Sequence, residues 1–289
     1  MKSEEVQPKA KVIFAGAGPG DPELITVRAA KYLLLADVVL VDRLVSPVII
    51  HSYLKPGVTV VFVGKQAGKS GSIPQPRINE LLLQYALPGK LVVRLKGGDV
   101  SVFSNILDEL ETLTANNISF EIIPGVTAGL GAAAYAGIPL TARGYSTAVR
   151  FLTYYKEEVI TGEVWKELAQ TTDTLVFYMA SKQLEHLIDH LLSAGISADK
   201  PLAVIEQATT AFQRISFNKV GGIMETLQDK ELMSPALLII GDVVSLHKKF
   251  AWFTTIETEL NYFDPVTDPM KANEVGTGES KKSEHAAGF

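Results

Sequence analysis

The chain has 289 residues, an apolar content of 47%, a formal net charge of −5 and no cysteine. The acidic balance does not indicate a general nucleic-acid surface. The lack of cysteine excludes disulfides, thiolate metal sites and a cysteine nucleophile. No signal-peptide core is evident at the start, and no apolar run approaches the roughly 20 residues of a membrane span, so we expect a soluble, cytoplasmic protein.

In the first half of the chain, short apolar runs alternate with helical patterns. The runs expected to form strands are Val12–Ala15, Val38–Val41, Thr59–Val63, Leu91–Leu95 and Phe120–Ile123. The helical patterns between them lie near Leu24–Leu35, Ile78–Tyr85 and Ile106–Asn116. This alternation is typical of βαβ units and predicts a mainly parallel sheet.

A second α/β series follows the stretch Tyr135–Gly144, whose glycines and proline mark a boundary. We therefore expect domains at 10–141 and 146–253. The strands expected in the second domain are Val149–Thr153, Thr174–Tyr178, Leu202–Ile205, Arg214–Phe217 and Leu237–Ile240. The expected helices are Trp165–Ala169, Leu184–Leu192 and Ile223–Leu227. Residues 264–289 are polar, with almost nothing apolar to bury, and we expect a disordered tail.

The most informative stretch is VIFAGAGPGDPELIT at residues 12–26. An apolar run ends in a glycine turn and a helical pattern follows, which is where α/β proteins bind nucleotide-like ligands. Asp21 replaces the third glycine of a dinucleotide fingerprint, and its carboxylate opposes a pyrophosphate. Pro19 also removes a backbone donor that a phosphate needs. The turn therefore favours a ligand with an adenosine part and no phosphate chain.

Two further strands end in glycine-rich segments. In Leu95–Val100 the glycines let a ligand approach the backbone, and Asp99 can accept hydrogen bonds from ribose hydroxyls; an ordinary turn with a capping aspartate is the alternative. In Ile123–Thr141 we expect Thr127 to cap a helix of small residues, with tight packing as the alternative. Because open α/β sheets bind ligands beyond the carboxyl ends of their strands, three such ends in one domain favour a binding site.

An acid and a base follow the second and third expected strands. Asp42 comes directly after Val38–Val41, and Lys65 follows Thr59–Val63. On one edge of the sheet the two side chains can exchange protons if burial or pairing shifts their pKa values, whereas a salt bridge or loop capping is the structural alternative. The five histidines show no convincing ligand spacing, so no metal is expected.

Together these segments resemble the tetrapyrrole methylase family, most closely its uroporphyrinogen-III C-methyltransferases. The resemblance runs in unbroken order from Lys11 to Phe253. The matching pieces are VIFAGAGPGDPELITVRA, VLVDRLVSP, VGKQAG with SIPQ downstream, LKGGDV, PGVTAGLGAAAYAGIPLT, VFYMA, SPALLIIGDVV and the closing AWF. The nicotinamide-dependent oxidoreductases, the default for a glycine turn after a first strand, match less well because the third glycine is missing.

The resemblance implies an α/β fold of two domains, with a mainly parallel N-terminal sheet, a mixed C-terminal sheet, and S-adenosylmethionine in the cleft between them. It also implies a homodimer that uses a tetrapyrrole substrate and no metal. Carried over by position, the cofactor contacts are Pro19, Gly97, Gly98, Asp99, Val102, Thr127, Ala128, Met179, Ala208 and Ala236. Asp42 and Lys65 take the positions of a proton acceptor and a proton donor.

The implied reaction is methylation of uroporphyrinogen III at carbons 2 and 7, which gives precorrin-2 by way of precorrin-1. The substrate contacts carried over are Arg43, Asn105, Asp108, Arg143 and Met179. On this side the chain departs from the family's pattern: Asn105 replaces an arginine, Ala142 a histidine, and Gln66 a common arginine. Because the substrate carries many carboxylates, fewer cationic groups also allow a later precorrin or another acceptor, or a catalytically weak homologue that binds cofactor or tetrapyrrole.

Overall fold

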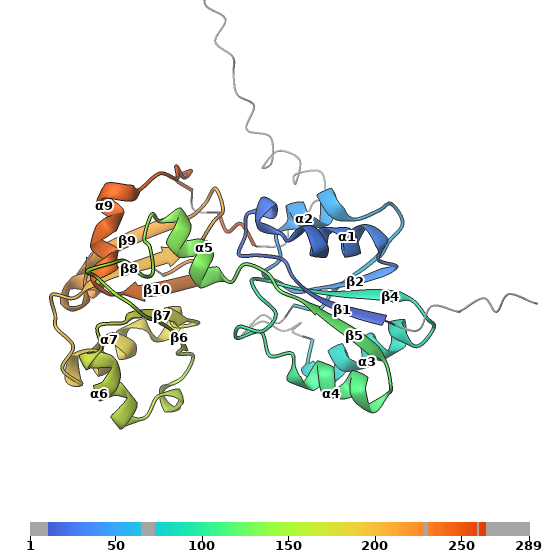
Figure 1. Ribbon diagram of the computed structural model, residues 1–289, viewed down its shortest axis with the longest axis horizontal. Helices are drawn as coiled ribbons and strands as arrows, with labels where there is room; N and C mark the ends of the chain where they lie inside the picture. The colour runs from blue at the N-terminus through green and yellow to red at the C-terminus, as the bar shows by residue number, and fades with distance from the viewer. Residues whose placement is uncertain (1–10, 65–72, 228–230, 259, 264–289) are drawn as a thin grey trace, which may run out of the picture.

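The protein is described by a computed structural model of residues 11–64, 73–227, 231–258 and 260–263. Figure 1 shows two layered α/β halves side by side, each built on one five-stranded sheet. The predicted base Lys65, the departing Gln66 and the polar tail 264–289 lie outside the described residues.

The first sheet is entirely parallel, with the order β3-β2-β4-β1-β5. Its strands are β1 (Lys11–Gly16), β2 (Val38–Val41), β3 (Thr59–Phe62), β4 (Leu91–Lys96) and β5 (Ser119–Ile123). Helices α1 (Val27–Leu35) and α2 (Pro47–Tyr53) cover one face, and α3 (Gln75–Ala86) and α4 (Leu107–Ala115) cover the other. Strands β1 and β2 are largely apolar on both sides because both faces are covered, whereas β4 carries the buried Arg94 and Lys96.

The neighbouring strands β1 and β4 send the chain to opposite faces of this sheet. After β1 the chain continues into α1, which covers one face, and after β4 it continues into α4, which covers the other. Such a switch leaves a crevice beyond the carboxyl ends of the two strands, where open α/β sheets bind their ligands. The glycine turns after β1 and β4 therefore lie where a ligand is expected.

The second sheet is mixed, with the order β6-β7-β10-β8-β9, in which only β6 and β7 run parallel. Its strands are β6 (Val149–Thr153), β7 (Thr174–Tyr178), β8 (Pro201–Glu206), β9 (Arg214–Lys219) and β10 (Ala236–Ile240). Helices α6 (Gly162–Gln170), α7 (Leu184–Ser193) and α8 (Ile223–Leu227) pack on one face. On the other face lie α5 (Ala128–Tyr135) and α9 (His247–Phe250). The predicted fold class is thereby confirmed.

Short 3-10 helices connect several of these elements. They span Pro22–Leu24, Glu157–Val159, Ser181–Gln183, Val220–Gly222 and Asp242–Leu246. In the described part of the chain, every helix is too short or too polar to cross a membrane.

Helix α5 belongs to the second half by packing, although it follows directly from β5 of the first. Its alanines Ala132 and Ala133 join the apolar cluster on the second sheet, with Ile239 of β10. The expected division at 141–146 stays a prediction, and we propose from this packing that the structural boundary falls nearer to Pro124. The polypeptide of the third glycine-rich segment therefore crosses from one half to the other.

Candidate functional site at the junction of the two halves

The three glycine-rich strand ends meet in one place. A Cβ on Gly16 would lie 2.6 Å from the Gly98 carbonyl oxygen and 2.7 Å from Gly125 Cα, so only glycine fits there. Gly18 and Gly98 form an antiparallel bridge in which each backbone N–H donates to the other's carbonyl, at 3.2 and 2.7 Å. Both have positive φ values, which glycine adopts without strain. The turns after β1, β4 and β5 thus form one continuous backbone surface.

The first glycine turn also contacts the second half. Pro19 packs on α5, where a Cβ at Gly131 would lie 2.6 Å from the Pro19 ring. A Cβ at Gly20 would lie 2.9 Å from the carbonyl oxygen of Ala208, which follows β8. Ala236, the first residue of β10, pairs with the last residue of β8. The structure therefore brings Pro19, Ala208 and Ala236, predicted from distant segments, to the same junction.

Asp99 is buried at the centre of this surface. Its Oδ1 accepts hydrogen bonds from the backbone N–H and the hydroxyl of Ser101, at 2.8 and 2.5 Å, and its Oδ2 accepts from the Gly125 N–H at 2.8 Å. Burial acts to raise the pKa of Asp99, but the hydrogen bonds from Ser101 and Gly125 outweigh it, and the pKa lies below its ordinary value. Asp99 is therefore a fixed negative charge that joins two of the glycine turns.

Asp21 has a local role that the sequence did not indicate. Its Oδ1 accepts from the Glu23 N–H at 2.8 Å, and its Oδ2 accepts from the Tyr135 hydroxyl at 2.5 Å. Burial, together with the Asp21 hydrogen bond, raises the pKa of Tyr135, so this hydroxyl stays protonated and donates. The carboxylate of Asp21 thus ties the first glycine turn to α5.

The predicted capping role of Thr127 is wrong in its detail. Thr127 is the N-cap residue of α5, but its side chain makes no capping bond there. Its hydroxyl instead pairs with the hydroxyl of Tyr178 at 2.8 Å, and the Gly129 N–H donates to the same Tyr178 oxygen at 2.8 Å. Tyr178, at the end of β7, therefore accepts the hydrogen bond of a backbone N–H in the first turn of α5 and holds Thr127 in place across the junction.

Strained backbone conformations gather around this junction. The non-glycine residues with positive φ include Phe103 (52°), Asn105 (48°), Met179 (58°), Gln207 (48°) and Thr209 (67°). The Phe103 ring lies 4.9 Å from that of Tyr178, so the loop after β4 touches the end of β7. Such conformations cost energy and cluster at binding and catalytic sites. Met179, the residue after the buried strand β7, is also 47% exposed.

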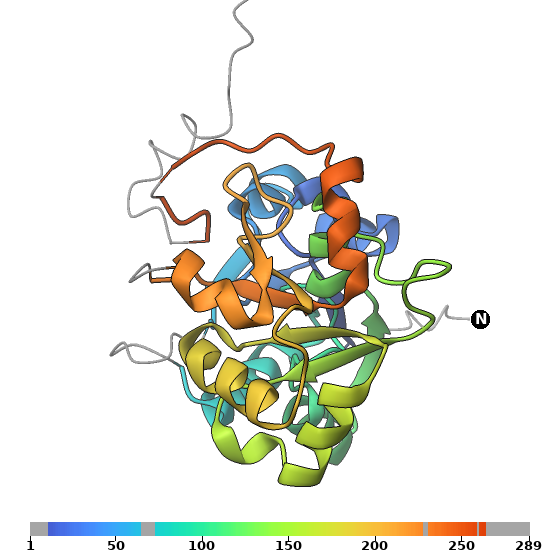
Figure 2. The ribbon, with the colours of Figure 1, turned by 90° about the vertical axis from the view of Figure 1, so that its left-hand side faces the viewer.

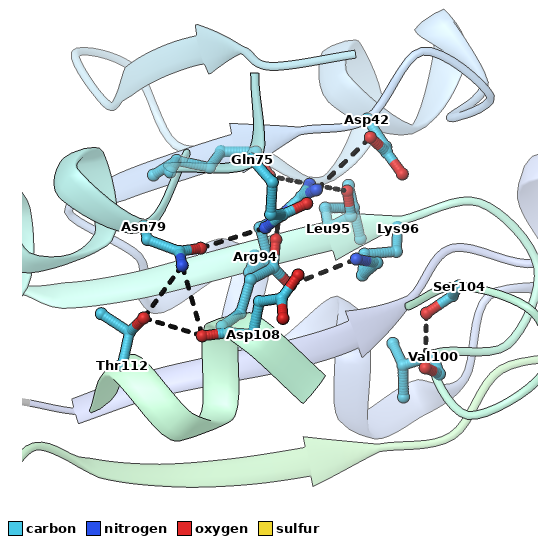
Figure 3. Close-up of polar contacts among 12 residues, drawn as sticks. Asp42, Gln75, Asn79, Arg94, Leu95, Lys96, Val100, Ser104, Asp108 and Thr112 are labelled. Atoms are coloured by element: carbon cyan, nitrogen blue, oxygen red, sulfur yellow. Dashed lines mark hydrogen bonds and ion pairs between the residues drawn. The ribbon is translucent and has the colours of Figure 1, made fainter. Parts of the chain in front are cut away.

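The predicted acid Asp42 is held by an arginine from the adjacent strand. Its backbone N–H donates to the Leu95 carbonyl at 2.9 Å, and its Oδ1 lies 3.4 Å from the Arg94 guanidinium (Figure 3). The Asp42 side chain is 32% exposed, whereas that of Arg94 is 2% exposed. Arg94 also donates to the carbonyls of Leu40 and Leu95, at 3.4 and 3.3 Å. Asp42 thus has a fixed cationic partner while part of its carboxylate faces solvent.

Behind Asp42 the charges continue into the protein core. Arg94 and Lys96 lie on the face of β4 that α3 and α4 cover, and Glu109 of α4, with no exposed surface, accepts from both, at 2.9 and 3.1 Å. Burial and the neighbouring Arg94 lower the pKa of Lys96, although Glu109 and Asp42 act to raise it. Two cations and two carboxylates are therefore balanced in one network that ends at Asp42.

The predicted substrate residues are less tightly grouped. Asn105 and Asp108 are exposed at the start of α4, and Arg143 is exposed in the turn that the Ala142–Ser146 bridge closes. Arg43 is half-buried against Gly64, at the end of the segment before Lys65. In the part of the chain that the structure describes, no group of three or more His, Asp or Glu side chains can hold a metal ion. The roles of these residues, and the expectation of no metal, stay predictions.

Comparison with known proteins assigns the chain to a family. The profile of the family Tetrapyrrole (Corrin/Porphyrin) Methylases matches residues 11–223. The chain therefore belongs to the tetrapyrrole methylases, a family of methyltransferases.

Individual relatives show which members of the family the chain is similar to. The chain is 43% identical over 250 residues to a siroheme synthase of Stutzerimonas stutzeri, covering 86% of this chain and 53% of that protein. It spans about half the length of the siroheme synthases that it matches. A uroporphyrin-III C-methyltransferase from Thermus thermophilus, solved with S-adenosyl homocysteine, has a TM-score of 0.69 and 34% identity, covering 82% of this chain and 99% of that one. A cobalt precorrin-4 methyltransferase has a TM-score of 0.72 and 30% identity, covering 82% and 96%.

Proposed function

We propose that the protein transfers methyl groups from S-adenosylmethionine to carbons 2 and 7 of uroporphyrinogen III, giving precorrin-2 by way of precorrin-1. Family membership and the similarity to siroheme synthases and to a uroporphyrin-III C-methyltransferase support this reaction. The observation that carries the proposal is the meeting of three glycine turns around one buried carboxylate, Asp99, at the switch point of the first sheet.

The residues at this junction suit an adenosyl sulfonium better than a dinucleotide. A Cβ at Gly98 would meet nothing nearer than the Ala128 nitrogen at 3.7 Å, so the missing side chain leaves space for a ligand. Asp99 keeps its negative charge and can accept bonds from ribose hydroxyls. The segments Gly16–Gly20, Gly97–Val100 and Pro124–Ala128 contain no lysine or arginine that could neutralise a pyrophosphate. We therefore place S-adenosylmethionine here, with small apolar walls from Ala128, Ala208 and Ala236.

Bound there, S-adenosylmethionine supplies an electrophilic methyl group on a sulfonium. The chain's residues orient the acceptor carbon in line with that methyl and exclude water, which together account for much of the acceleration in such transfers. As the carbon–carbon bond forms, the carbon–sulfur bond breaks and its electron pair stays on sulfur, leaving S-adenosylhomocysteine. The methylated macrocycle then loses a proton. We assign Asp42 to accept that proton, since its carboxylate is held by Arg94 but remains part-exposed. For Lys65 we keep the proton-donor role that the family resemblance implies, and no part of this transfer depends on it.

The test is anaerobic incubation of the full chain with uroporphyrinogen III and isotopically labelled S-adenosylmethionine, followed by mass analysis. The proposal predicts products heavier by one and then two labelled methyl groups. Asp42→Asn, assayed in the same way, tests the role of Asp42. Its matched control is Asp199→Asn, which removes an exposed carboxylate of the second half. Absence of labelled product with uroporphyrinogen III, while another tetrapyrrole is methylated, would overturn the acceptor assignment.

A later precorrin is the second candidate acceptor. The fold resembles a cobalt precorrin-4 methyltransferase as closely as a uroporphyrin-III C-methyltransferase, and Asn105 and Ala142 stand where cationic or donor groups were expected. Uroporphyrinogen III and precorrin-2 assayed side by side distinguish the two acceptors. Tight binding of S-adenosylhomocysteine with no transfer to either compound indicates a binding homologue instead.

The oligomeric state and the cellular location of the protein are further proposals. We propose a homodimer in the cytoplasm, as the family resemblance implies. Light scattering on the purified full chain gives the mass of the assembly, and a monomer at working concentrations would contradict this part of the proposal.

A further inference from the structure

The chain continues beyond α9 as an ordered segment of residues 251–258 and 260–263, here called the C-terminal segment. Figure 2 shows it, in red, leaving α9 and running across the top of the molecule. Residues 254–263 follow the Trp252-Phe253 pair at which the resemblance to the family ends. Although most of this segment is exposed, its last residue, Phe263, is only 4% exposed. The segment therefore ends packed into the protein.

The segment contacts the loop Glu206–Gln213, which runs from the last residue of β8 to the residue before β9. The Ile256 N–H donates to the Ala211 carbonyl at 2.7 Å. The side chain of Gln207 is fully buried, and both atoms of its amide group bond to the segment. Its Oε1 accepts a hydrogen bond from the Tyr262 N–H at 2.6 Å, and its Nε2 donates one to the Leu260 carbonyl at 3.3 Å. This arrangement mimics the pairing of a strand with its neighbour and fixes residues 260–262 against the loop.

Tyr262 carries the contact on to the first half of the molecule. Its hydroxyl pairs with the hydroxyl of Ser46 at 2.8 Å, and Ser46 is 1% exposed. Burial raises the pKa of Tyr262, although the Ser46 hydrogen bond acts to lower it, so the phenol stays neutral. Ser46 is the N-cap residue of α2 and lies four residues after Asp42. One tyrosine thus joins the loop of the predicted acid to the loop after β8.

The loop Glu206–Gln213 forms part of the proposed cofactor site. It contains Ala208, and the hydroxyl of Thr209 accepts a hydrogen bond from the Asp21 N–H of the first glycine turn at 3.0 Å. Gln207 and Thr209 both have positive φ values, which non-glycine residues keep only when their surroundings impose them. The Gln213 side chain accepts from the Thr209 N–H on one side of the loop, and the C-terminal segment holds Gln207 on the other.

We propose that residues 260–263 are a clamp that holds the loop Glu206–Gln213 in its binding conformation, with Tyr262 as the positioning residue. The proposal rests on the proposed function, since it assigns the clamped loop to the S-adenosylmethionine site. Without the clamp, the loop relaxes from its strained conformation, and binding the cofactor must restore it, which weakens affinity.

The experiment compares Tyr262→Ala and Tyr262→Phe with the wild-type full chain, and uses Glu257→Ala, an exposed side chain on the same segment, as the matched control. Calorimetry with S-adenosylhomocysteine gives the affinity, and hydrogen exchange without ligand gives the protection of the amides at 206–213. We expect Tyr262→Ala to weaken binding by at least tenfold and to accelerate exchange in the loop. Tyr262→Phe removes one hydrogen bond, and we expect an effect of about two- to tenfold. Glu257→Ala leaves both quantities unchanged.

Two further measurements separate positioning from general stability. In Ser46→Ala the affinity falls as in Tyr262→Phe, and the double variant shows no additional loss, because both changes remove the same bond. In steady state, Tyr262→Phe raises KM for S-adenosylmethionine more than it lowers kcat. A folded Tyr262→Ala variant with wild-type affinity and unaltered loop exchange would overturn the clamp. If the wild-type protein itself binds no S-adenosylhomocysteine, the proposed function fails, and the exchange data alone decide whether the clamp exists.

Discussion

The buried network behind Asp42 gives the most quantitative prediction. In Glu109→Gln the carboxylate that accepts from Arg94 and Lys96 becomes a neutral amide of nearly the same shape. Both cations remain almost completely buried, and the remaining carboxylate, Asp42, lies 3.4 Å from Arg94 and is partly screened by solvent. Removing one partner of a buried ion pair costs about 3–5 kcal/mol. Because glutamine keeps one acceptor oxygen, we expect a loss near the lower end, about 3 kcal/mol at pH 7.

The pH dependence of this loss distinguishes buried charge from lost packing. Burial already lowers the pKa of Lys96, and without Glu109 it falls further. Between that lowered pKa and the ordinary value of 10.5, the unfolded chain holds the Lys96 proton while the folded variant has released it. The unfolded state then binds more protons, so the stability of the variant rises with pH in this window. The deficit relative to wild type should therefore be smaller at pH 9.5 than at pH 7.

Urea unfolding at both pH values, with m-values compared, measures the deficit. The matched control is Glu111→Gln, an exposed glutamate on the same helix, which should change stability by no more than about 0.5 kcal/mol. A deficit below about 1 kcal/mol at pH 7, or an equal deficit at the two pH values, would refute the reasoning.

Three further predictions concern the proposed site. Asp42→Asn should lower turnover by roughly 10²-fold or more and leave the affinity for S-adenosylhomocysteine within about twofold, as steady-state kinetics and calorimetry will show; a large loss of affinity would assign Asp42 to the cofactor instead. Gly98→Ala places its Cβ in open space, 3.7 Å from the Ala128 nitrogen, and strains the positive φ of this position at a cost of about 1–3 kcal/mol of stability. The folded variant should bind S-adenosylhomocysteine at least about tenfold more weakly, because the methyl group occupies ligand space; unchanged calorimetric affinity would count against the site. Because Asp99 has a lowered pKa, its stabilisation is present above its ordinary value of 3.8 and is lost as the pH falls through the folded value. Asp99→Asn should therefore be less stable than wild type at pH 7, and the gap should shrink as the pH is lowered below 3.8 in thermal unfolding; a gap that does not change with pH would contradict this assignment.

The parts of the fold that local sequence determines were predicted well. The strands β2, β6 and β7 match their expected bounds to the residue because each is a short run in which apolar or β-branched side chains predominate. The glycine turns were predicted for a related reason: only glycine fits the close contacts at Gly16, and glycine adopts the positive φ of Gly98 without strain.

The features that sequence reasoning missed depend on partners distant in the chain. Arg94 and Lys96 interrupt an apolar strand, a signal of buried charge, but nothing near them indicated Glu109 as their counter-ion. Tyr178 was expected only as part of a strand, and its bond to Thr127 joins residues 51 positions apart. The role of Tyr262 was equally hidden, because its partner Ser46 lies 216 positions away.

The short helix α2 (Pro47–Tyr53) was also not expected. Its apolar residues are too few to show a helical period, and the local signals of a helix start are only the serine and the proline at Ser46 and Pro47. Its position matters because Ser46, its N-cap residue, is the point where Tyr262 meets the first half.

A crystal structure of the full chain with S-adenosylhomocysteine tests the central claim most directly. The account predicts electron density for the adenosine beside Gly98 and Ala128, with a ribose hydroxyl within hydrogen-bond distance of Asp99 and the sulfur facing the side of the junction where Asp42 lies. Density for the ligand at another position, or a phosphate-bearing dinucleotide bound at these glycine turns in its place, would contradict it.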